Sequence, residues 1–138
     1  MFDYLESSTG TKELIRNRQI EAIIMSELPT IDRCMLMVIP KKSYFEWANS
    51  LPSTYSIIEP DDTVEPSSYL LPDFDDEEDV EKFISKKFRI IFENELSAWT
   101  SNETEWPTKI TYKVFKDWFD IHVSTMVFDL GQNAIKVV

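Results

Sequence analysis

Few residues of this sequence have side chains suited to catalysis, and His122 is the only histidine. Asp120 precedes it by two residues, and because side chains alternate along a strand, the carboxylate and the imidazole would share one face. A carboxylate that orients an imidazole is a common arrangement for general acid–base catalysis. His122 and Asp120 are therefore the catalytic candidates, although a lone histidine in a strand is more often structural or simply exposed.

Other nucleophiles and metal ligands have weaker support. Ser124 lies outside any G-x-S-x-G elbow. The single cysteine, Cys34, lies in an apolar run, which predicts a buried, unreactive thiol of a reducing compartment. One histidine excludes multi-histidine metal sites and most zinc sites. The sequence therefore predicts no metal and no cofactor, and it leaves catalysis open while favouring a protein that is not an enzyme.

A long amphipathic helix, at about residues 75–99, is the main element of the sequence. Apolar side chains recur in it at three- and four-residue intervals, which places them on one face. Phe83 and Ile90 widen this apolar stripe beyond the face that an ordinary surface helix buries. A stripe of this width must contact more than one neighbour, so we expect it to serve both the core and a homo-oligomer, most simply a dimer.

The start of this helix is strongly acidic, with carboxylates at Asp75, Asp76, Glu77, Glu78 and Asp79. Two interpretations remain open. The run is either a solvated helix start that the helix dipole favours, or an interaction surface for a basic protein partner. It lacks the alternating ligands and the turning glycine of an EF-hand loop, which argues against a cation site.

The four tryptophans are the next candidates for an interaction surface. Trp47, Trp99 and Trp118 fall within helical patterns and are predicted to lie mainly in the core. Trp106 lies between a polar loop and Pro107, so we expect it to be the exposed exception and an anchor at a protein interface.

Length and charge limit the possible functions. The 138 residues suit one domain, and 43% hydrophobic content suits a packed core. A formal net charge of −11 repels phosphate backbones, which argues against nucleic-acid binding. No apolar run is long enough for a membrane span, and the N-terminus lacks the features of a secretory signal. We therefore expect a cytoplasmic protein that does not bind membranes.

The remaining segments indicate an α+β or α/β domain with a sheet of three to five strands packed on the long helix, together with two or three shorter helices. Residues 1–10 are predicted to be a flexible lead to a single domain at 11–138. The expected shorter helices are 11–28, a helix capped by Ser43 that ends near Leu51, and a helix capped by Thr111. The expected strands are 33–39 and 121–130, both apolar on both faces, together with 55–58, 68–71 and 134–138.

Several short pieces resemble a group of small bacterial proteins of uncharacterised function. The resemblance covers about residues 35–130 and rests on VIPKK with a following Trp47, YLLP at 69–72, WP at 106–107, FKDWF at 115–119 and VFDL at 127–130. It implies a compact bacterial cytosolic domain and carries over no activity and no site residues.

Two functional hypotheses follow. The first is a non-enzymatic, acidic interaction or regulatory module, of the inhibitor, immunity or adaptor type, that binds a basic protein. The second is a small-molecule-binding protein or enzyme with an aromatic pocket that uses His122 and nearby carboxylates. The first predicts an exposed apolar or acidic patch, and the second predicts a concave pocket around His122.

Overall fold

The computed structural model describes residues 28–54 and 65–138. Contacts divide the chain into two compact units, one of which is residues 32–127. The described part of the other unit is residues 28–31 and 128–138, in which Thr30 forms an isolated antiparallel bridge with Phe128. Residues 1–10, the predicted strand 55–58 and all but the last residue of the predicted helix 11–28 lie outside the described residues. The single domain at 11–138 stays a prediction.

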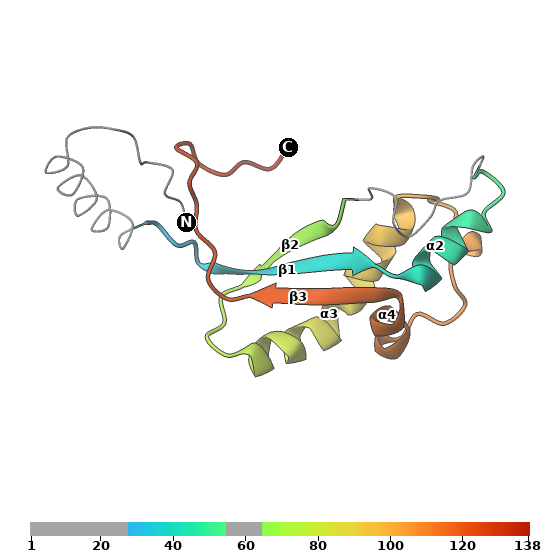
Figure 1. The fold of residues 1–138 in the computed structure, drawn as a ribbon, viewed down its shortest axis with the longest axis horizontal. Coiled ribbons are helices and arrows are strands. Elements are labelled where there is room, and N and C mark those ends of the chain that lie inside the picture. The colour runs from blue at the N-terminus through green and yellow to red at the C-terminus, as the bar shows by residue number, and fades with distance from the viewer. Residues whose placement is uncertain (1–27, 55–64) are drawn as a thin grey trace, which may run out of the picture. The chain divides into compact units, whose positions relative to one another are not determined.

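The unit of residues 32–127 is a mixed α+β structure, which confirms the predicted class (Figure 1). Its described strands form one antiparallel sheet in the order β2-β1-β3. In chain order the elements are β1 (Arg33–Pro40), α2 (Lys42–Asn49), β2 (Ser67–Pro72), α3 (Glu77–Ser97), the 3-10 helix η1 (Glu103–Glu105), α4 (Tyr112–Trp118) and β3 (Phe119–Ser124).

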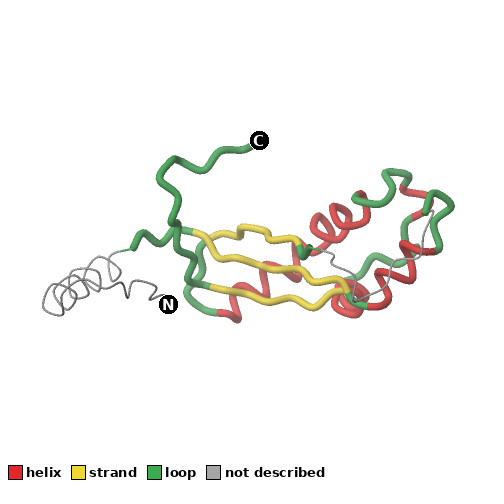
Figure 2. The backbone as a smooth tube through the Cα atoms, turned by 45° about the horizontal axis from the view of Figure 1, so that its top comes forward, coloured by secondary structure: helices red, strands yellow, loops and turns green. Residues whose placement is uncertain are grey.

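The sheet buries only one of its faces. In the central strand β1, Cys34, Leu36 and Val38 are fully buried, whereas Met37 is 36% exposed. Helix α3 runs behind the strands in Figure 1, whereas α2 lies beyond the end of β1 (see also Figure 2). Buried residues of α3 and of β1 belong to the same core. The prediction that this strand is buried on both faces was therefore wrong, because among the described residues nothing covers the second face.

Helix α3 matches the predicted long helix and is two residues shorter at each end. The side chain of Asp76 caps it by accepting a hydrogen bond from the backbone N–H of Glu78, 2.9 Å away. Three carboxylates occupy its first turn, where the helix dipole favours negative charge. The buried residues on its core-facing side are Val80, Ile84, Ile91, Phe92, Glu95 and Leu96.

Neighbours in the same unit cover most of the wide apolar stripe of α3. Phe83 contacts Phe74, with ring centroids 5.6 Å apart, and the ring centroid of Phe88 lies 5.6 Å from that of Tyr112. Ile90 remains 66% exposed. Of the two residues that widen the stripe, Phe83 is thus covered within the chain and Ile90 is not, and the dimer stays a prediction.

Helix caps and strand ends show where local patterns succeeded and failed. Thr111 caps α4 by accepting from Val114 N, as predicted. The predicted capping box at Ser43 was wrong, because the N-cap of α2 is Lys41, two residues earlier, and it makes no side-chain capping hydrogen bond. The strand predicted at 121–130 is β3, which begins at Phe119, directly after α4, and ends at Ser124. The predicted strand 134–138 is not formed.

No helix of the described residues is both long enough and apolar enough to cross a membrane.

Candidate functional site

The sheet face that carries the predicted catalytic residues is open. His122 is exposed and lies opposite Met37 in the register of β1 and β3, and its imidazole makes no hydrogen bond or ion pair with the described residues. Asp120 is also exposed, and its carboxylate lies 3.8 Å from the ammonium group of Lys41. Alternation does place both side chains on one face, as predicted. Neither residue lines the cavity between α2 and α4 or the smaller cavity at the start of α3.

The predicted interaction residues fall into two environments. Asp75, Asp76, Glu77 and Glu78 are exposed to solvent at the start of α3 and form no ion pair with described residues. Trp106 is half-buried, and its indole N–H donates to the carbonyl oxygen of Thr100 at 3.0 Å. Trp106 therefore secures the loop after α3 and is less exposed than the sequence suggested.

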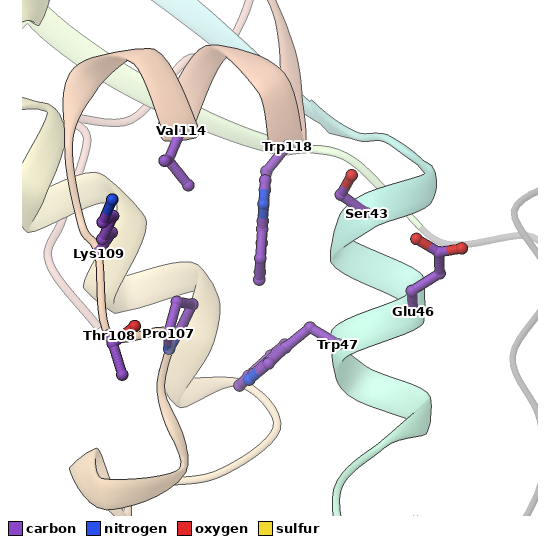
Figure 3. Close-up of a pocket in the computed structure, with 8 residues that line it drawn as sticks. All are labelled: Ser43, Glu46, Trp47, Pro107, Thr108, Lys109, Val114 and Trp118. Carbon is purple, nitrogen blue, oxygen red and sulfur yellow. The ribbon is translucent and has the colours of Figure 1, made fainter.

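A cavity on this unit lies elsewhere, between α2 and α4. It has a volume of about 580 Å³ and is open to solvent along one side. We call it the Trp groove, and its lining is Ser43, Glu46 and Trp47 from α2, Pro107, Thr108 and Lys109 from the loop after η1, and Val114 and Trp118 from α4 (Figure 3).

Helical spacing brings the lining residues to one surface. Ser43, Glu46 and Trp47 stand at i, i+3 and i+4 in α2, and Val114 and Trp118 stand at i and i+4 in α4, so each helix presents one side to the groove. Figure 3 shows the indoles of Trp47 and Trp118 projecting from the two helices toward the space between them. The rings are 6.1 Å apart at their centroids and tilted by 45°.

Hydrogen bonds fix the walls of the groove. The indole N–H of Trp47 donates to the carbonyl oxygen of Glu105 at 2.9 Å, which ties α2 to the loop wall. Lys41 N donates to the carbonyl oxygen of Trp118 at 2.8 Å, and its ammonium group donates to that of Lys116 at 3.1 Å. The end of α4 is therefore attached to the β1–α2 junction.

The core supports both indoles from behind. Trp118 contacts Phe92, with centroids 5.4 Å apart, and Trp47 contacts Tyr44 at 5.7 Å. Phe92 is fully buried and Tyr44 is 3% exposed, so these supports hold defined positions. The indoles thus form a stable apolar floor whose open side faces solvent.

The rim of the groove carries one charge of each sign. Glu46 lies on the α2 side, where its carboxylate is 3.9 Å from Lys42 in an exposed pair that contributes little. Lys109 lies on the loop side and forms no ion pair with any described residue. The lining supplies a single carboxylate and neither histidine nor cysteine. It is better equipped to bind an apolar group with polar edges than to move protons.

A cluster of polar side chains lies inside the unit, around Glu95, which is 6% exposed. The hydroxyl of Tyr69 donates to its carboxylate at 2.5 Å, and the hydroxyl of Tyr44 donates to its backbone carbonyl at 2.6 Å. Burial, together with the nearby Glu95 charge, raises the pKa of both tyrosines above its ordinary value. Every buried side-chain polar atom of the described residues has a partner, so this cluster holds the fold together.

A smaller cavity of about 210 Å³ lies at the start of α3, between Phe74, Phe83 and the polar side chains of Asp79, Lys82 and Lys86. Asp79 supplies the only carboxylate in the lining of this cavity. The described residues contain no group of three or more His, Cys, Asp or Glu side chains that could hold a metal ion.

Sequence reasoning did not find the Trp groove. Trp47 and Trp118 were predicted to lie mainly in the core. Each indole does pack against a core residue, but each also lines the groove, which the prediction did not include. The only signal was that both lie on the border of an apolar helical face. Nothing in the pattern indicated that these two borders, far apart in the sequence, would meet.

Comparisons of the chain with protein families, with curated proteins and with solved structures found no match.

Proposed function

We propose that this chain is a non-enzymatic interaction module that binds an extended segment of a partner protein in the Trp groove. The observation that carries this proposal is the pair of supported, partly exposed indoles on the floor of an open groove. Tryptophan is enriched among the residues that dominate binding at protein interfaces, because its side chain supplies a large contact area at little entropic cost.

The shape of the groove favours a chain segment as the ligand. A small molecule is usually surrounded over most of its surface, whereas this groove is open along one side. An extended segment can lie across such a groove and continue beyond both of its ends.

The charge of the protein favours a basic partner. A net charge of −11 attracts positively charged proteins over distances of about a Debye length, which raises the rate of encounter. The exposed carboxylates at the start of α3 contribute to this field without contacting the ligand. An inhibitor, immunity or adaptor role in the cytoplasm fits such a module, and a homo-oligomer, most simply a dimer, remains part of the proposal.

A second candidate function uses the same groove for a small molecule. Its volume falls within the roughly 300–1,000 Å³ of typical ligand sites, and its floor is aromatic. This version of the small-molecule hypothesis does not use His122, which lies outside the groove.

Selection from a displayed library of random linear peptides on the purified protein tests the proposed function. We expect enriched peptides whose affinity falls at least tenfold on Trp118→Ala and stays within twofold on Ile90→Ala, an exposed control on α3. The proposal is wrong if no peptide is enriched, or if the enriched peptides bind the Trp118→Ala protein as tightly as the original, provided that circular dichroism shows both variants folded.

A further inference from the structure

Trp118 carries the one polar atom on the floor of the Trp groove that has no partner. The indole N–H groups of Trp47 and Trp106 donate to backbone carbonyls, whereas that of Trp118 donates to no acceptor in the described residues. Every buried side-chain polar atom of the described residues has a partner, so this N–H must be reachable by solvent. A ligand seated here can therefore bring a hydrogen-bond acceptor to it.

The spacing of the two indoles restricts the shape of the group that fits. A planar ring held between two parallel rings needs roughly 7–8 Å, twice the carbon–carbon contact distance. The ring centroids of Trp47 and Trp118 are 6.1 Å apart and the rings are tilted by 45°, so the two indoles touch each other and leave no room for a flat ring between them. A compact, non-planar apolar group that rests on this floor fits better than a flat ring inserted between the indoles.

Proline in an extended chain satisfies both requirements. Its ring is compact and puckered, and it has no backbone N–H that the groove would have to satisfy. Polyproline II segments have no internal hydrogen bonds, so their carbonyls are free to accept from an indole. With three residues per turn, prolines at i and i+3 face the same way, about 9 Å apart.

Other backbone conformations fit the lining less well. A helical ligand has already used most of its carbonyls, and an added strand requires an exposed sheet edge. The groove is lined by α2, α4 and a loop, and no lining residue belongs to a strand.

The rim charges set the chemistry of the flanking residues. Glu46 is held only by its exposed pair with Lys42, so it is available to a cationic side chain. Lys109 on the opposite rim has no partner among the described residues, so it is available to a carboxylate. The net charge of −11 adds a general preference for a basic partner.

We infer, on the basis of the proposed function above, that the ligand of the Trp groove is a proline-containing segment in the polyproline II conformation with a basic residue beside its prolines. One proline rests on Trp47 and Trp118, a main-chain carbonyl accepts from the Trp118 indole N–H, and the basic side chain lies against Glu46.

Two synthetic peptides test this inference. The first carries two prolines three residues apart with an adjacent lysine, and the second is identical except that alanine replaces both prolines. Isothermal titration should show binding of the first peptide at least tenfold tighter than that of the second. Trp118→Phe, which keeps an aromatic ring and loses the donor, should weaken the first peptide about five- to tenfold. Glu46→Gln should weaken it about two- to threefold at low salt and should reduce its salt dependence.

The controls separate this inference from the proposed function. Ile90→Ala should leave the affinity for both peptides unchanged. If the library yields peptides that depend on Trp118 while the two synthetic peptides bind equally, the polyproline inference is wrong and the interaction module stands. If no peptide of either kind binds, both are wrong. Should Trp118→Phe fail to fold, the proline and alanine peptides still decide the matter with the unmodified protein.

Discussion

Glu95 is the one charged residue that is buried among the described residues, and its contacts show how single side chains stabilise this fold. A buried carboxylate is costly unless hydrogen bonds replace its hydration. The Tyr69 hydroxyl supplies one at 2.5 Å and in turn accepts from the side-chain amide of Asn94 at 2.9 Å. This chain of hydrogen bonds joins β2 to α3 at one edge of the sheet.

Replacing Tyr69 by phenylalanine tests this contribution. Loss of the hydroxyl leaves the buried carboxylate of Glu95 without its donor, so the free energy of unfolding should fall by about 1.5–3 kcal/mol. Tyr112→Phe is the matched control, because the Tyr112 hydroxyl donates to the exposed carboxylate of Glu81 and its loss should cost less than about 1 kcal/mol. Urea denaturation measures both, and equal losses would contradict the role given to Glu95.

Helix α3 organises the packing at the scale of elements. Phe92, on its inner side, has ring contacts with Phe115, Trp118 and Phe119 at 5.8, 5.4 and 5.6 Å. It therefore links α3, α4 and β3, and it also supports one indole of the Trp groove.

Two substitutions on α3 distinguish its inner and outer sides. Phe92→Ala removes a fully buried ring and should lower the free energy of unfolding by about 3–5 kcal/mol. Ile90→Ala, at a position that is 66% exposed, should change it by less than about 0.5 kcal/mol. Thermal or urea unfolding measures both. A large loss at Ile90 would contradict the assignment of its side chain to the exposed outer side of α3.

Periodicity predicted α3 well because the signal extends over many turns and matches one buried side. Short elements were predicted less well, since a few residues allow several registers. The capping residue Ser43 illustrates this: its pattern suits a helix start, yet α2 begins at Lys42, where the chain leaves β1. The apolar outer residues of β1, such as Met37, indicated a second covered face that the described structure lacks.

The Trp groove could not be predicted at all from local patterns. Trp47 and Trp118 belong to different helices, and only the packing of α2 and α4 beside the β1–α2 junction brings them together. Sequence periodicity indicates which face of a single helix is apolar, but it does not indicate that the edges of the apolar faces of two helices will lie side by side.

At the scale of the whole molecule, the buried tyrosines make stability depend on alkaline pH. Burial raises the pKa of Tyr44 and Tyr69 in the folded chain, whereas in the unfolded chain both ionise near pH 10. Above about pH 10 the unfolded chain therefore holds fewer protons than the folded chain, and each further rise in pH favours unfolding.

We accordingly expect the tyrosine contribution to the free energy of unfolding to be constant below about pH 9 and to decrease above about pH 10. The slope should approach at most about 1.4 kcal/mol per pH unit for each buried tyrosine. Urea denaturation at pH 8, 10 and 11 measures this dependence, and the double variant Tyr44→Phe, Tyr69→Phe should show a shallower decline. The same decline in the protein and in the double variant would contradict the assignment.

The central claim is that the Trp groove binds a ligand through Trp118, and the indole N–H signals of the ¹⁵N-labelled protein test it most directly. Without ligand, the Trp118 N–H should exchange with solvent faster than the hydrogen-bonded N–H groups of Trp47 and Trp106. On titration with the proline-containing peptide, the Trp118 signal should move downfield as its N–H gains an acceptor, while the Trp106 signal stays in place. A Trp118 signal that is protected before titration, or unchanged by every peptide selected on the protein, would contradict the account.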